Sequence, residues 1–166
     1  LSLSDNKQPI DFKAAISQDA LAVTDASGLL QLLDPKTAQQ KAKIQLPSPA
    51  NNDLWISEGL LFVESKQNLS CFNIKTGLEK IWDLKLPDSS LSGSPSIINK
   101  NLLLSLQDGS LLSIDTKTGK IQTKTKTPLP TSGSIVNLNN LILVPTVDGS
   151  FYRIDQVLQQ KGQASL

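Results

Sequence analysis

The apolar positions of this chain fall into short runs that recur about every forty residues. Each repeat has an apolar run, a tight turn and a second apolar run that ends in an acid or amide. The first run of each repeat is nearly continuous, at residues 20–23, 60–63, 102–106 and 141–144. Runs of this kind are typical of strands covered on both faces. Self-similarity at this period indicates an array of units that bury their faces against one another.

A tight turn between the two runs marks the period. In the third and fourth repeats it is Asp108-Gly109 and Asp148-Gly149, a pair suited to positive φ at both central positions of a hairpin turn. The first repeat has Ser27-Gly28 and the second has Gln67-Asn68 at this place. Successive turns are 40, 41 and 40 residues apart when counted from Gly28. This spacing predicts one hairpin turn per repeat.

A short polar residue closes the second run of each repeat: Asp34, Asn73, Asp115 and Asp155. Such side chains favour an Asx turn at a strand end, and Lys-Thr-Gly or Lys-Thr-Ala follows in the first three repeats. We therefore interpret the recurring aspartates as turn residues rather than calcium ligands. Leu-Pro pairs at 46–47, 86–87 and 129–130 then end the repeats, because proline cannot donate to a strand ladder.

The segment 120–127 alternates in character, as expected for an outer strand half open to water. The third repeat then supplies four strands, predicted at 95–98, 102–107, 111–115 and 120–127. Four short antiparallel strands joined by tight turns make one propeller blade. The predicted fold class is all-β: one propeller segment over 1–166, with four-stranded blades at about 11–47, 54–87, 94–130 and 134–158.

The segment 109–120, Gly-Ser-Leu-Leu-Ser-Ile-Asp-Thr-Lys-Thr-Gly-Lys, is similar to the repeat of the quinoprotein-like (PQQ-like) β-propellers. The resemblance extends over nearly the whole chain in four copies, of which the third matches best. In that family a tryptophan of each blade docks into the neighbouring blade. Here Trp82 is the candidate, one position later than the motif places it. Ile44, Thr123 and their neighbours would fill the other docking positions with less apolar area.

The resemblance implies rings of seven or eight blades, so four blades make about half a ring. The chain could be a segment of a longer protein, one of two copies that complete a ring, or a small four-bladed ring. The absence of methionine favours a segment or a processed product. A free half-ring would expose the apolar faces of its terminal blades. We therefore expect the rest of a longer chain, or a homodimer partner, to cover them.

Composition removes several classes of chemistry. Sixteen basic residues against fifteen acidic ones give no electrostatic footprint for nucleic acid. No apolar stretch reaches the roughly 18 residues of a membrane-spanning helix. The sequence has no histidine, the commonest general base and metal ligand. The one cysteine, Cys71, lies in an apolar run and is interpreted as a buried, unreactive thiol. No catalytic, cofactor-binding or metal-binding residue and no cofactor is predicted.

The Leu-Pro links are the longest and most polar connections, and loops on a rigid scaffold usually carry binding. We expect a partner-binding surface in and beside them, with the candidate residues Asn52, Asp53, Trp55, Asp88, Ser89, Ser90 and Thr131. Trp55 is alternatively a core residue. The hypothesis is a non-catalytic protein-interaction or scaffolding module, which the resemblance places in the periplasm or elsewhere outside the cytoplasm of a bacterium. The alternative is part of a quinoprotein-like enzyme or sensor whose active site lies on other blades or on a fused domain.

Overall fold

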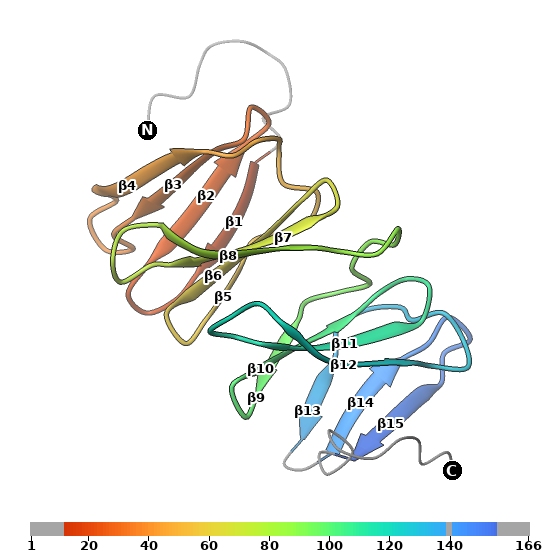
Figure 1. Ribbon diagram of the computed structural model, residues 1–166. Coiled ribbons are helices and arrows are strands. Elements are labelled where there is room, and N and C mark those ends of the chain that lie inside the picture. Colours follow the sequence, from red (N-terminus) through yellow and green to blue (C-terminus); the bar gives the residue numbers. More distant parts are fainter. Residues whose placement is uncertain (1–11, 139–140, 156–166) are drawn as a thin grey trace.

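The computed structural model describes residues 12–138 and 141–155, which form fifteen strands in four antiparallel sheets (Figure 1). Each sheet is a meander whose strands pair in chain order. Three sheets have four strands, and the described part of the last has three. This confirms the predicted all-β propeller segment, and we name the sheets blades 1 to 4. The described residues contain no helix long and apolar enough to cross a membrane.

The strand bounds are as follows. Blade 1 contains β1 (Phe12–Ile16), β2 (Leu21–Asp25), β3 (Leu29–Leu33) and β4 (Gln40–Gln45). Blade 2 contains β5 (Trp55–Ser57), β6 (Leu60–Ser65), β7 (Asn68–Asn73) and β8 (Glu79–Lys85). Blade 3 contains β9 (Ser96–Ile98), β10 (Asn101–Ser105), β11 (Ser110–Asp115) and β12 (Ile121–Lys126). Blade 4 contains β13 (Val136–Leu138), β14 (Leu141–Pro145) and β15 (Phe151–Asp155).

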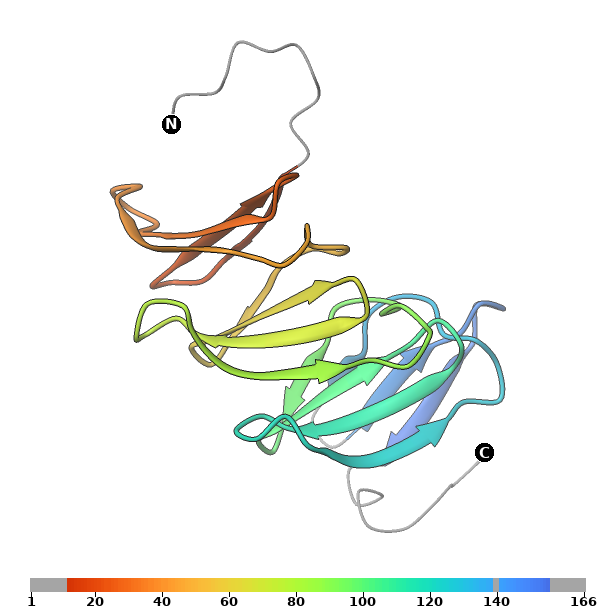
Figure 2. The same ribbon diagram turned by 45° about the horizontal axis from the view of Figure 1, so that its top comes forward.

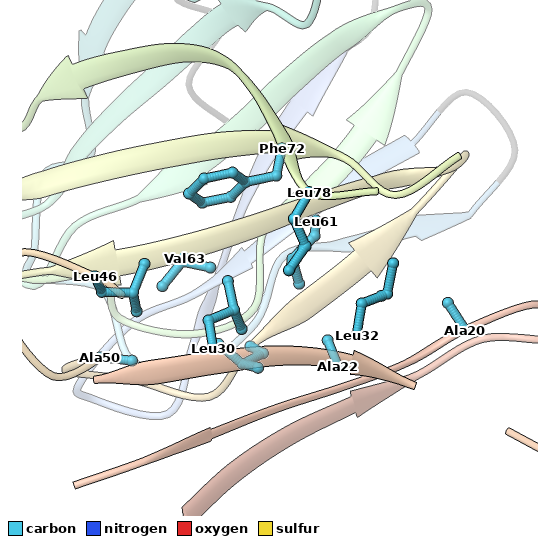
Figure 3. Packing of buried hydrophobic residues seen from close by; sticks show 11 residues of the cluster. Ala20, Ala22, Leu30, Leu32, Leu46, Ala50, Leu61, Val63, Phe72 and Leu78 are labelled. Carbon is cyan, nitrogen blue, oxygen red and sulfur yellow. The ribbon is translucent and has the colours of Figure 1, made fainter. Parts of the chain in front are cut away.

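The blades stack face to face in chain order, and an apolar core fills each of the three interfaces (Figures 1 and 2). Figure 3 shows the first interface, where Leu30 and Leu32 of blade 1 face Leu61, Val63 and Phe72 of blade 2. In blades 1 to 3 the two middle strands carry nearly all of this burial, and β6 is buried over five of its six residues. Its continuous apolar run therefore reflects cover on both faces, as predicted. The outer strand β12 alternates between exposed and half-buried side chains over its last four residues.

The turns between the second and third strands differ from the predicted geometry. Gly109 has a φ of 87°, whereas Asp108 is not in the left-handed region. The Gly109 N–H donates to the carbonyl of Leu106 at 2.8 Å, and the Leu106 N–H donates to the carbonyl of Ser110 at 2.8 Å. This is a three-residue loop with one left-handed glycine, so the expectation of positive φ at both Asp and Gly is wrong. The aspartate contributes through its side chain, which accepts a bond from the Ser110 N–H.

In blade 2 the same turn is one residue shorter. Ser65 pairs directly with Asn68, so the turn consists of Lys66 and Gln67 and Asn68 begins β7. Lys66 takes the positive φ, at 55°. The predicted turn at Gln67-Asn68 was therefore displaced by one residue, because the absence of glycine here hid the change of loop length.

The Asx turns at the end of each third strand are confirmed where the structure describes them. The Asp34 Oδ1 accepts bonds from the N–H groups of Lys36 and Thr37, and these bonds and Lys41 hold the pKa of Asp34 well below its usual range. The Asp115 Oδ1 likewise accepts bonds from the N–H groups of Lys117 and Thr118. Asn73 accepts one such bond. The side chain of Asp155 lies outside the described residues.

Trp82 docks into the next blade, as the resemblance implied. Its Nε1 donates to the carbonyl of Thr116 at 2.9 Å, and its side chain is buried in the core between blades 2 and 3. It pairs with Cys71, as Thr123 pairs with Ser113 in blade 3. In blade 1 this position belongs to Ala42, which pairs with Leu32. The docking position itself therefore holds Ala42, two residues before Ile44, which packs against the same core, and Thr123 stands at the position expected of it.

One additional residue in blade 2 explains the late position of Trp82. The turn after the third strand closes with a bond from Ala38 N–H to Asp34 in blade 1, which spans four residues. In blade 2 the bond runs from Leu78 N–H to Asn73 and spans five. Leu78 is the added residue, and its side chain is buried in the core between blades 1 and 2. It thus supplies apolar volume at the interface where the small Ala42 replaces a tryptophan.

Candidate functional site

The links between blades and the turns between second and third strands lie at the same end of the stack. Backbone hydrogen bonds join them. The N–H groups of Leu86, Gln107 and Val147 donate to the carbonyls of Gln67, Ser90 and Pro130, respectively. We call this end the linker face; it comprises residues 46–54, 86–95 and 127–135 and the turns 26–28, 66–67, 107–109 and 147–149. In Figure 2 the links lie to the right of the sheets, and the β3–β4, β7–β8 and β11–β12 turns lie to the left.

The link from blade 2 to blade 3 is held by turns of both blades. The Gln67 Nε2 donates to the Asp88 Oδ1 at 3.0 Å. The Asp108 N–H donates to the Ser89 Oγ at 3.1 Å, and the Gln107 N–H donates to the Ser90 carbonyl at 3.0 Å. Asp88 and Ser90 remain exposed and Ser89 is half-buried. Three of the candidate residues are therefore brought together on a surface whose backbone is fixed before any partner binds.

The link from blade 1 to blade 2 has a different character. Asn52 is half-buried and donates to the Oε2 of Glu64, a residue that is only 3% exposed. Burial raises the pKa of Glu64 against the hydrogen bonds that lower it, of which that from Asn52 is the largest. Asn52 thus supports a buried carboxyl group, which sequence reasoning had not identified. Asp53 is exposed, next to the buried Leu54 that anchors the link.

Two candidates lie inside the molecule. Thr131 is 2% exposed; its Oγ1 donates to the Leu106 carbonyl at 2.6 Å and lies within hydrogen-bond distance of the Ser92 Oγ, at 2.9 Å. The expectation that Thr131 belongs to the partner-binding surface is wrong, because its buried hydroxyl joins the two links instead of facing a partner. Trp55 is half-buried, with its ring centroid 4.8 Å from that of Phe62. Core packing accounts for this tryptophan.

Further carboxylates of the linker face come from the turns rather than the links. Asp108 and Asp148 are exposed, and Asp25, the last residue of β2 next to the turn 26–28, is half-buried. Hydroxyl groups of Thr146 and Ser150 lower the pKa of Asp148, and the Ser27 hydroxyl lowers that of Asp25. The lowered pKa values keep Asp25, Asp108 and Asp148 ionised at neutral pH. Their Asp-Gly or Ser-Gly turns were visible in the sequence, but nothing in it showed that the turns meet the links.

Other chemistry is limited among the described residues. No group of three or more Cys, Asp or Glu side chains there could hold a metal ion. Burial raises the pKa of the Cys71 thiol to about 12, as expected of an unreactive core thiol. The described residues thus offer a polar, largely acidic surface on a rigid scaffold, rather than a set of reacting groups.

Four stacked meander sheets joined by links at one end define a β-propeller segment. The sequence matches the family described as outer membrane protein assembly factor BamB over residues 3–165, and the chain belongs to that family. A comparison with curated proteins found no significant match.

Solved structures share the fold at low sequence identity. BamB from Moraxella catarrhalis has a TM-score of 0.69 and 19% identity, over 84% of this chain and 41% of its own. The computationally designed Ika4 protein has a TM-score of 0.72 and 16% identity, over 93% of this chain and 95% of its own. Sqt1 from Saccharomyces cerevisiae has a TM-score of 0.74 and 15% identity, over 94% of this chain and 47% of its own. This chain therefore spans less than half the length of the BamB and Sqt1 chains.

Proposed function

We propose that this chain is a non-catalytic, PQQ-like propeller segment that acts as a protein-interaction or scaffolding module. The observation that carries the proposal is the link at 86–95, which two blades fix in place while Asp88 and Ser90 stay exposed. A surface ordered before binding loses little conformational entropy on association. The family description, outer membrane protein assembly factor, supports a role for the parent protein in assembling other proteins outside the cytoplasm, in the periplasm of a bacterium.

The charge of the linker face favours a basic partner segment. Asp53, Asp88, Asp108 and Asp148 are all exposed on it, against one exposed basic residue of its links and turns, Lys66. Lys126 lies 3.8 Å from Asp108, but both side chains are largely exposed, so this ion pair neutralises the face weakly. Complementary charge speeds encounter and selects the partner. We therefore propose a partner that presents lysine or arginine side chains to this face.

The absence of catalysis is part of the same proposal. It is supported by a sequence without histidine and by carboxylates whose hydrogen bonds are used to build turns. A second copy of the chain is a further candidate partner, because the outer faces of the terminal blades carry exposed apolar side chains.

Site-specific photo-cross-linking in producing bacterial cells tests the linker face. A photoreactive residue at Asp53 or at Asp88 should give adducts with another protein. Lys36 and Lys117, exposed in turns at the opposite end, are the matched controls and should give few or none. The Asp53→Lys, Asp88→Lys double variant, with the photoreactive residue at Ser90, should lose the adduct without loss of folding. Equal adducts at all positions, or none at Asp53 and Asp88, would contradict the proposal.

A further inference from the structure

Large apolar side chains are exposed on the two outward faces of the stack. Phe12 is 62% exposed and Ile16 70%, both on β1 at one end. Leu138 is 57% exposed and Phe151 61%, on β13 and β15 at the other. Blades 1 and 4 lie at opposite ends of the stack (Figure 1). A stable protein in water rarely leaves two such sheet faces uncovered.

The outward face of blade 1 repeats a pattern that is covered in the next two blades. Ile16 pairs with Leu21 on β1 and β2, and Val23 follows two residues later on the same face. The corresponding residues of blade 2 are Ile56, Leu61 and Val63, and those of blade 3 are Ile97, Leu102 and Leu104. In blades 2 and 3 these side chains pack into the core shared with the preceding blade. Blade 1 is therefore built to receive a preceding blade.

The outward face of blade 4 repeats the opposite pattern. Leu143 of β14 corresponds by strand register to Leu103 in blade 3 and Phe62 in blade 2. Phe151 of β15 corresponds to Leu111 and Leu69. Those four residues belong to the cores shared with the following blade. Blade 4 is therefore built to receive a following blade.

We propose that a second copy of this chain covers both faces, with blade 4 of each copy packed against blade 1 of the other. The two contacts would be equivalent and would continue the three interfaces inside each copy. Each copy supplies one face of each kind, so two copies leave no terminal face open and give a closed ring of eight blades.

Light scattering on the 166-residue chain over a range of concentrations tests the proposal, with the expectation of a mass twice that of one chain. Ile16→Glu and Leu138→Glu each remove one kind of face at a largely exposed side chain, so the fold of the single chain should persist. Either variant alone should be monomeric, with dimerisation weakened at least about tenfold. An equimolar mixture of the two should regain a dimer, because one intact head-to-tail contact remains.

Val147→Glu is the matched control, because Val147 is 59% exposed but lies on the linker face. It should leave the dimer unchanged. A wild-type chain that stays monomeric at all concentrations would overturn the proposal, and would assign the cover to further blades of a longer chain. A dimer that survives both single variants, or a mixture that remains monomeric, would also overturn it. The cross-linking experiment on the linker face does not depend on this result.

Discussion

Gly93 and Gly133 bring the inner ends of blades 3 and 4 into backbone contact. A Cβ atom at Gly93 would lie 2.3 Å from the carbonyl carbon of Gly133. The Gly133 N–H donates to the Ser92 carbonyl at 2.9 Å, and the Ser94 N–H donates to the Ser134 Oγ at 3.0 Å. The two Ser-Gly-Ser segments therefore join neighbouring blades at the point where no side chain fits between them.

Gly93→Ala should destabilise the protein by about 1–3 kcal/mol, because its methyl group must displace backbone atoms. Gly93 is not among the glycines with positive φ, so the cost measures the contact rather than backbone strain. Urea unfolding measures it. Ser94→Ala, at an exposed neighbouring residue, should change the free energy of unfolding by less than about 0.5 kcal/mol. Equal effects of the two changes would show that the blades do not approach so closely.

Trp82→Phe should cost more stability than Trp55→Phe. Trp82 is 8% exposed and its Nε1 donates to the Thr116 carbonyl, which phenylalanine cannot replace. Losing that buried bond should add about 1–3 kcal/mol to the cost of the smaller ring. Trp55 is half-buried, so less packing is lost there. These are the only two tryptophans, so each variant can be followed by the fluorescence of the other. A larger loss for Trp55→Phe would contradict the docking role of Trp82.

Thr123→Leu should stabilise the interface between blades 3 and 4. Thr123 stands where Trp82 stands in blade 2, and a cavity of about 60 Å³ adjoins it, lined also by Leu103, Leu111 and Ile154. Leucine would bury about one further CH₂ group in this half-open apolar pocket, which should gain up to about 1 kcal/mol. Lys124→Leu, at an exposed position of the same strand, should give no comparable gain in thermal unfolding. No gain at Thr123 would mean that the pocket beside it does not accept a larger apolar side chain.

The sequence predicted features that depend on local chemistry, such as the Asx turns at Asp34 and Asp115. It missed features that depend on the alignment of one blade with the next. Leu78 is an added residue in its turn, and only the strand register shows that it displaces Trp82. Thr131 follows a Leu-Pro pair and resembles a loop residue, yet it is buried because two links meet there. Spacing along a chain does not reveal such contacts between repeats.

Asp53→Asn and Asp88→Asn should leave the free energy of unfolding within about 0.5 kcal/mol of the wild type. Both residues are exposed, and an amide oxygen can still accept the bond that Asp88 receives from Gln67. Thermal unfolding measures the stability of each variant. If the linker face binds a basic partner, the same changes should reduce the cross-link formed at Ser90. Loss of folding would instead make these residues structural and would refute their assignment to a binding surface.

The stability conferred by Glu64 should fall as the pH rises. Burial raises the pKa of this carboxyl group in the folded state, so the folded protein holds its proton at pH values where the unfolded chain has released it. Its contribution is therefore complete below the ordinary pKa of glutamate and is lost as the pH rises through the higher pKa of the folded state.

Glu64→Gln removes this titration and keeps an oxygen for Asn52. As the pH rises from 4 to 7, the variant should therefore gain stability relative to the wild type, as measured by urea unfolding. Asp148→Asn is the control, because a lowered pKa leaves no titration above pH 5 and its difference from the wild type should stay constant from there to pH 7. A Glu64→Gln difference that is independent of pH would show that the carboxyl group is already solvated or ionised in the fold.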